Sequence, residues 1–167
     1  MNIFYLSSNA KQAAVYHNDK HVVKMILESA QLLSTAHRVL DIIPADSILY
    51  KATHIHHPSA KWARDNINNY QWLYDLFCGL CEEYTFRYSK THLTESKLKH
   101  VLKQAPMNIS TAAFTQPPQA MPIELHSTNS INAYRTYYIT RKSHLARWTK
   151  REIPFWYKDN KDNNAHV

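Results

Sequence analysis

The sequence predicts an all-α fold, a compact single-domain bundle of about five to six helices joined in one place by a long proline-containing loop. Two observations favour helices over strands. The 167 residues include a single glycine, Gly79, so the Asn-Gly and Asp-Gly turns that close β-hairpins are missing. Apolar residues instead recur three and four positions apart, and residues suited to helix caps precede these stretches. The length suits one domain, which we expect to cover residues 1–158.

In the first half of the chain, capping residues mark two helices. Ser8 or Asn9 can cap a short helix over residues 10–16. Asn18 or Asp19 can cap a longer helix, which continues to residue 40 because its apolar positions keep helical spacing.

A polar loop then leads to Pro58, which fits the first turn of a third helix. From Trp62 an apolar and aromatic pattern continues to residue 90, with asparagines near position 66 as a candidate break. The only cysteines, Cys78 and Cys81, lie in this pattern. We interpret them as core residues rather than a metal or redox site, because no second pair of ligands accompanies them.

Two further helices are predicted in the second half. Thr94 can cap one that ends near residue 103, and Asn129 or a neighbour can cap another over residues 130–150. Between them, residues 105–123 carry four prolines and predict an irregular segment crossing the surface or covering a cleft. The polar residues 159–167 are expected to fray.

The net charge of +7 is concentrated in one part of the chain. Residues 96–151 contain nine Lys and Arg but a single acidic residue, Glu124. Such an excess of positive charge is typical of a protein that binds a phosphate-bearing partner, and it is also compatible with an ordinary basic surface. A single glycine cannot build a phosphate-binding loop, so Lys, Arg and helix N-termini would have to recognise phosphate. This favours a DNA backbone over a nucleotide cofactor.

No part of the chain has the apolar length of a membrane span, and the N-terminus lacks a basic region followed by a long apolar run. The sequence therefore predicts a cytoplasmic protein without a membrane partner. We expect no cofactor, and the sequence does not define an oligomeric state.

One face of the second predicted helix carries reactive side chains. Lys20, His21, Lys24 and Glu28 lie three or four positions apart, so an amine and a carboxylate meet one helical turn apart. The alternative is an ordinary solvent-exposed face, with a Lys24–Glu28 ion pair worth a few tenths of a kcal/mol.

A second cluster consists of His54, His56 and His57. In an extended segment His54 and His56 point to one side and His57 to the other, and no zinc motif such as HExxH accompanies them. We therefore expect no metal site.

Three ordered motifs resemble a known family. They are Asp19-Lys20-His21-Val22-Val23-Lys24 with Glu28, then His56-His57-Pro58 with Trp62, then Cys81-Glu82-Glu83-Tyr84 with Arg87. They are similar to the patterns DK(R/H)xxK…E, NHP…W and C(D/E)E(W/Y)…R of the pyrimidine dimer DNA glycosylase (endonuclease V-like) family, as found in phage and bacterial proteins. The resemblance covers about residues 1–90, and the basic-aromatic segment near residue 150 is similar to the end of the phage enzymes.

The resemblance implies an all-α enzyme that binds damaged duplex DNA and cleaves a glycosidic bond with an amine nucleophile. It implies Glu28 as the carboxylate that stabilises the sugar cation and takes a proton, and Lys20 or Lys24 as amine or phosphate clamp. His21 and His57 would be further polar groups of the pocket. In the phage enzymes, which are also AP lyases, the nucleophile is the α-amine exposed by removal of the initiator methionine, and Asn2 is large enough to prevent that removal. Three alternatives follow: the Met1 amine serves, a lysine of the α-helical face serves, or the chain is not a lyase.

For DNA contacts the acid-poor segment offers basic and aromatic side chains. The basic candidates are Arg135, Arg141, Lys142, Arg147, Lys150 and Arg151, and the candidates for stacking on a base are Trp148, Trp156 and Tyr157. Two other functions fit the same residues: a helical nucleic-acid-binding protein without catalysis, or a phage enzyme acting on a modified base or nucleotide.

Overall fold

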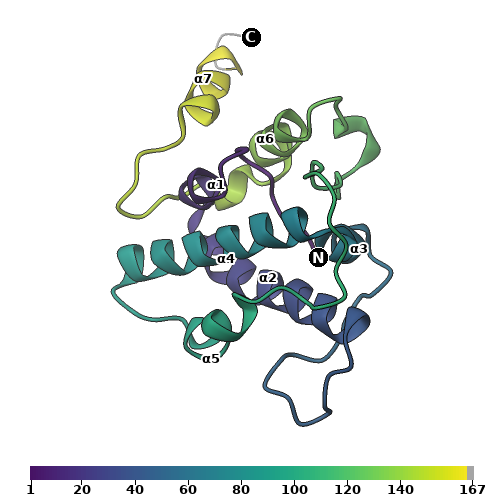
Figure 1. The fold of residues 1–167 in the computed structure, drawn as a ribbon. Helices are drawn as coiled ribbons and strands as arrows, with labels where there is room; N and C mark the ends of the chain where they lie inside the picture. Colours follow the sequence, from purple (N-terminus) through teal and green to yellow (C-terminus); the bar gives the residue numbers. More distant parts are fainter. Residues whose placement is uncertain (165–167) are drawn as a thin grey trace.

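The computed structural model describes residues 1–164, and over that range the chain forms α-helices and short 3-10 turns with no strand. The α-helices are α1 (Ala10–Tyr16), α2 (Asp19–Leu40), α3 (Pro58–Asp65), α4 (Ile67–Tyr88), α5 (Leu93–Leu102), α6 (Ser130–Arg141) and α7 (Phe155–Asn164). The 3-10 turns are η1 (Ile123–Leu125) and η2 (Ser143–Leu145). The all-α prediction is confirmed (Figure 1).

Asparagine side chains begin several of the helices. The side-chain oxygen of Asn18 accepts a hydrogen bond from the His21 N–H at 2.9 Å, which satisfies one of the free donors in the first turn of α2. Asn9 and Asn129 cap α1 and α6 in the same way, as the sequence predicts. At α5, however, the cap is His92, whose Nδ1 accepts from the Thr94 N–H at 3.2 Å.

The second half of the chain differs from prediction in two places. The helix expected to continue to residue 150 ends at Arg141, because residues 147–149 bond to the start of α2 instead of to their own preceding turn. The tail expected to fray from residue 159 begins inside α7, which ends at Asn164. Residues 165–167 of that tail lie outside the described residues.

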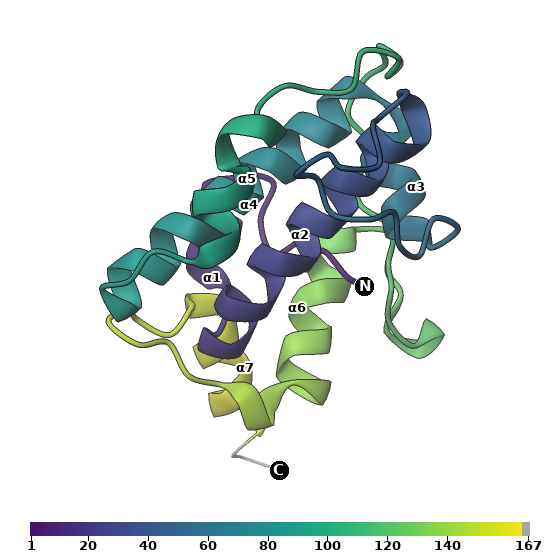
Figure 2. The same cartoon turned by 90° about the horizontal axis from the view of Figure 1, so that it is seen from below.

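The two longest helices, α2 and α4, cross at the centre of the molecule (Figure 1). In Figure 1, α1 and α6 lie on one side of this pair and α5 on the other, and in Figure 2 the length of α6 is seen beside α2. The N-terminal residues thread between these helices, and Ile3 and Leu6 are fully buried. Among the described residues, no helix has the length and apolar character needed to cross a membrane.

The proline-containing segment is ordered, and side chains of earlier elements hold it. Trp62 Nε1 donates to the carbonyl of Thr115 at 3.0 Å, and the Thr115 N–H donates to Asn69 Oδ1 at 3.0 Å. Near its end, the Ala120 carbonyl accepts from Asn2 Nδ2 at 2.8 Å. The segment therefore crosses the surface of α3 and α4 and reaches the N-terminal residues.

Candidate functional site

The amine and the carboxylate on α2 meet as their spacing predicts. Lys24 Nζ lies 3.3 Å from Glu28 Oε1, one helical turn away. The Lys24 side chain is 68% exposed, whereas that of Glu28 is only 14% exposed. An accessible amine therefore lies against a carboxylate that is largely shielded from solvent, where electrostatic interactions are stronger than in bulk water.

His57 and the start of the chain lie near the same carboxylate. His57 is the N-cap of α3, and its Nδ1 accepts from the Ser59 N–H at 3.1 Å. Burial lowers the pKa of His57, the positive charges of the Met1 amino group and of His54 lower it further, and Glu28 opposes them. His57 and the two charged groups that act on it, the Met1 amine and Glu28, are called the His57 group.

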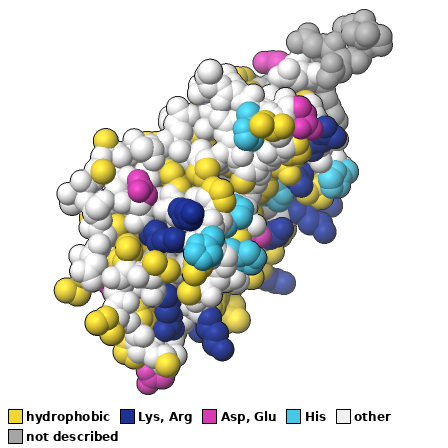
Figure 3. All heavy atoms as spheres, turned by 90° about the vertical axis from the view of Figure 1, so that its right-hand side faces the viewer, with side chains coloured by type: hydrophobic (Ala, Val, Ile, Leu, Met, Phe, Trp, Pro, Cys, Tyr) yellow, Lys and Arg dark blue, Asp and Glu magenta, His cyan; other side chains and the backbone are white. Residues whose placement is uncertain are grey.

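The first residues of the chain are held in place by Asn2. Its Oδ1 accepts from the Ile3 N–H at 2.8 Å, and its Nδ2 donates to Ala120 of the proline-containing segment. Figure 3 shows the face of the molecule on which the N-terminus and α3 lie in Figure 1, and histidine side chains gather there beside Lys and Arg side chains.

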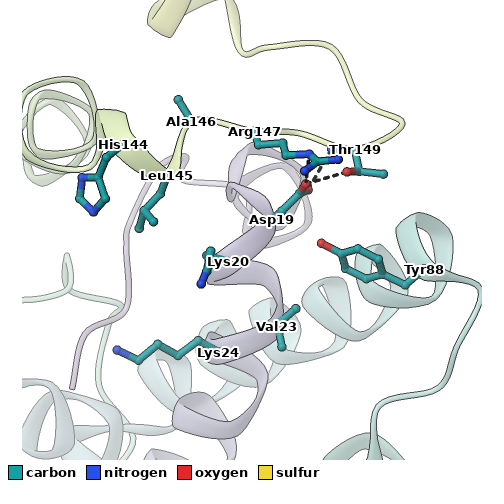
Figure 4. Close-up of a pocket in the computed structure, with 10 residues that line it drawn as sticks. All are labelled: Asp19, Lys20, Val23, Lys24, Tyr88, His144, Leu145, Ala146, Arg147 and Thr149. Atoms are coloured by element: carbon teal, nitrogen blue, oxygen red, sulfur yellow. Dashed lines mark hydrogen bonds and ion pairs between the residues drawn. The ribbon is translucent and has the colours of Figure 1, made fainter.

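Next to this group is a surface pocket of about 880 Å³. Lys20, Val23 and Lys24 of α2 form one wall, residues 144–147 and Thr149 form the opposite wall, and Tyr88 at the end of α4 closes one side (Figure 4). Apolar surface from Val23, Leu145 and Ala146 lies between cationic groups from both walls. Such a site suits a ligand with an apolar ring and a phosphate.

His21, expected in the pocket, is buried in the core. Its Nδ1 lies 2.6 Å from the Tyr138 hydroxyl, and its ring stacks on Phe4 with a centroid separation of 4.1 Å. Burial, followed by the positive charge of His17, lowers the pKa of His21 to about 3. Position 21 lies about 60° around α2 from position 24 and about 100° from position 20. This rotation is enough to turn His21 toward the core, while Lys20 and Lys24 stay exposed.

The three aromatic residues proposed to stack on a base are buried too. Trp148, Trp156 and Tyr157 are 7%, 5% and 2% exposed, so none presents a ring face to a ligand. Trp148 Nε1 donates to the Tyr16 carbonyl at 2.9 Å, and its ring packs edge-on against Tyr157. These residues attach the C-terminal part to the core, which corrects the expectation of a stacking platform.

Two of the six predicted basic contacts are partly buried and bonded to groups of the protein. Arg135 donates to the Leu6 carbonyl at 3.0 Å and lies over the rings of Tyr16 and Trp156. Arg151 pairs with Glu83 at 2.7 Å and lies 4.1 Å from the ring centroid of Phe86.

The other four basic side chains are more accessible, and one of them lines the pocket. Arg141 pairs with Glu124 at 3.1 Å, Lys142 lies over the Tyr137 ring, and Lys150 donates to the Phe86 carbonyl. Arg147 is 83% exposed and borders the pocket opposite Lys20 and Lys24. The structure therefore brings Arg147, Lys20 and Lys24 together, and it places Glu28 one helical turn beyond Lys24 on α2, with His57 at the start of α3.

Sequence reasoning missed the contribution of Asp19, Glu83 and Arg87 to this site. All three belong to the recognised motifs, but their partners lie up to 130 residues away and could not be paired from spacing. Arg87 bonds to both Asp19 and Glu83 at 3.0 Å, and its side chain is fully buried. The signal available in the sequence was the occurrence of acidic and basic residues at helix positions otherwise surrounded by core residues.

Within residues 1–164, no group of three His, Cys, Asp or Glu side chains is arranged to hold a metal ion. Cys78 and Cys81 are free thiols on α4, away from the pocket. Burial raises the pKa of both, so neither thiol is activated as a nucleophile.

The fold and site define a helical protein with a cationic pocket beside an amine and a shielded carboxylate. A family model described as Pyrimidine dimer DNA glycosylase matches residues 1–96, and the chain belongs to this family. The family places it among DNA glycosylases, whose substrate is DNA. No curated protein and no solved structure gives a significant match. The matched part contains α1–α4, Glu28 and His57, whereas residues 144–149 of the pocket lie beyond it.

Proposed function

We propose that the chain is a DNA N-glycosylase with AP-lyase activity, acting on damaged or modified pyrimidines through an amine nucleophile and Glu28. The observation that carries this proposal is the position of Glu28. Its Oε1 lies 3.3 Å from Nζ of Lys24, which lines the cationic pocket, and Glu28 and the Met1 amino group both act electrostatically on His57. Family membership supports the substrate class.

The chemistry needs an amine and a carboxylate in these places. A neutral amine attacks C1′ of the nucleotide, the bond from C1′ to the base breaks, and the base leaves with a proton. Opening of the sugar ring then gives an iminium ion, whose positive charge the Glu28 carboxylate stabilises. Glu28 next accepts a proton from C2′, the 3′ C–O bond breaks, and hydrolysis of the imine by water frees the amine.

His57 has a supporting part in this proposal. Because burial and neighbouring charges lower its pKa, it is neutral at physiological pH and can hydrogen-bond the sugar or the departing base without adding positive charge. The amine itself is either Lys24 Nζ, 3.3 Å from Glu28, or the Met1 amino group, which acts on His57 together with Glu28. Lys20 lies one turn further along the pocket wall and serves as a phosphate contact.

Trapping with borohydride tests the proposal. Duplex DNA containing a pyrimidine dimer, incubated with the protein and borohydride, should give a covalent adduct, and peptide mapping of the adduct identifies the amine. Glu28→Gln should lower strand cleavage by about 100-fold or more while duplex binding is retained. Glu82→Gln is the matched control, because Glu82 is an exposed α4 carboxylate paired with Lys11 outside the pocket.

Two results would contradict the proposal. Binding of the duplex without adduct and without strand cleavage would leave a nucleic-acid-binding protein without this activity. Equal cleavage by wild-type protein and Glu28→Gln would remove Glu28 from the site.

A further inference from the structure

The wall of the pocket opposite α2 is a short segment, residues 144–149, called the strap below. It follows α6 and crosses the N-terminal end of α2 (Figure 4). Asp19 holds it at two points: the Asp19 N–H donates to the Arg147 carbonyl at 2.9 Å, and the Asp19 carboxylate accepts from the Thr149 N–H at 2.9 Å and from the Thr149 hydroxyl at 2.6 Å. The strap is therefore fixed to α2 at Arg147 itself and two residues after it.

The Asp19 carboxylate is itself fixed from the protein interior. Arg87 Nη1 donates to Asp19 Oδ1 at 3.0 Å. The same guanidinium donates to the carbonyls of His17 and Val15 and to Glu83, so its orientation is set by the ends of α1 and by α4. A carboxylate with such partners has little freedom to rotate, so the strap residues bonded to it are held in place as well.

The side chain of Arg147 remains accessible. Its Nε lies 3.7 Å from Asp19 Oδ2, a longer separation than any hydrogen bond that carboxylate accepts, and its side chain is 83% exposed. An exposed ion pair of this length contributes little stability. Arg147 lines the pocket from the strap, with its guanidinium above Asp19, while Lys20 and Lys24 line it from α2 (Figure 4).

We propose that the strap is a positioning device: Asp19 and Thr149 hold Arg147 where its guanidinium binds a phosphodiester of the DNA that enters the pocket. This rests on the proposed function, because it takes DNA as the ligand. A guanidinium can bind two phosphate oxygens at once. This two-point contact depends on a fixed backbone position more than the single contact of a flexible lysine does. Phosphate held between the strap and α2 would place the adjoining sugar toward Glu28.

The salt dependence of DNA binding tests this inference, because a merely structural role of the strap would leave that dependence unchanged. Each neutralised phosphate contributes about 0.9 to the slope of log affinity against log salt. Arg147→Ala should weaken duplex binding and lower the slope by about that amount. Thr149→Val removes no charge but should lower the slope by a similar amount. Thr149→Ser, which keeps the hydroxyl, should have the wild-type slope. The double variant Arg147→Ala with Thr149→Val should bind DNA no more weakly than Arg147→Ala alone.

The controls separate this inference from the proposed function. Lys103→Ala removes an exposed cation at a different surface and should leave the slope unchanged. If Thr149→Val keeps the wild-type slope, or if the double variant loses the sum of both effects, the strap does not position Arg147. If the variants behave as expected but no borohydride adduct forms, the strap inference stands and the glycosylase proposal fails.

Discussion

Gly79, the single glycine, lies in the middle of α4 where α1 packs against it. A Cβ added there would lie 2.9 Å from the Cβ of Ala14 and 3.4 Å from the Cα of Lys11. Both contacts are with the body of α1 rather than with the end of a flexible side chain. The sequence suggests this use of the residue, since a glycine inside a predicted packed helix costs about 1 kcal/mol of helix propensity and needs a compensating close approach.

Gly79→Ala should therefore destabilise the protein. The gain in helix propensity of about 1 kcal/mol is outweighed by overpacking against α1, which typically costs about 1–3 kcal/mol. Urea unfolding should give a lower free energy of unfolding, and Gly79→Ala combined with Ala14→Gly should recover part of the loss. An increase in stability for Gly79→Ala alone would contradict the close packing of α1 on α4.

At the level of elements, α1, α2, α4 and the C-terminal segment are joined by a buried ionic network. Arg87 of α4 connects Glu83 with Asp19, and Arg151 pairs with Glu83 from the C-terminal side. Removing one member of such a network is destabilising, because each buried carboxylate needs its positive partner to offset the free energy of desolvation. Asp19, which this network holds, also bonds to Arg147 and Thr149, and these tertiary bonds replace the last turns of the helix predicted to reach residue 150.

Arg87→Met should lower the free energy of unfolding by about 3–5 kcal/mol, because it leaves Asp19 and Glu83 buried with fewer positive partners. Lys11→Met is the comparison, since the Lys11–Glu82 pair is 3.0 Å long but more than half exposed on both sides. Its loss should cost less than about 1 kcal/mol. Similar losses for the two variants in chemical denaturation would show that the network is not effectively buried.

For the whole molecule, buried histidines set the dependence of stability on pH. Burial lowers the pKa of His17 to about 4 and that of His21 to about 3, from ordinary values of 6.5. As pH falls below 6.5 the unfolded chain takes up protons that the folded protein does not, so stability is lost progressively down to about pH 4 for His17 and about pH 3 for His21.

The free energy of unfolding should thus decrease between pH 6.5 and pH 4 by up to about 1.4 kcal/mol per pH unit for each of the two histidines. Denaturant unfolding at a series of pH values measures this slope. His21→Phe should lower the slope because it removes one group from the titration, and His100→Gln, at an exposed position, should leave it unchanged. An unchanged slope in His21→Phe would show that His21 is protonated as readily in the folded protein as in the unfolded chain.

The elements that could be predicted from the sequence are those decided by nearby residues. The asparagine caps fix the starts of α1, α2 and α6 through hydrogen bonds that span three residues or fewer. The Lys24–Glu28 contact follows from helix geometry in the same way. The basic-aromatic segment after α6 could not be predicted, since its aromatic residues suit a DNA surface and a core equally well.

The sequence by itself determined the all-α class, the order of the main helices and the pairing of an amine with a carboxylate on α2, because periodicity and capping act over one or two turns. Only the tertiary structure decided that His21, Trp156 and Tyr157 face inward, that Glu28 and the Met1 amine both act on His57, and that Arg147 shares a pocket with Lys20. These outcomes depend on contacts between residues far apart in the chain. The free energy that favours these contacts comes from burial and from paired buried charges, which cannot be predicted from a local sequence pattern.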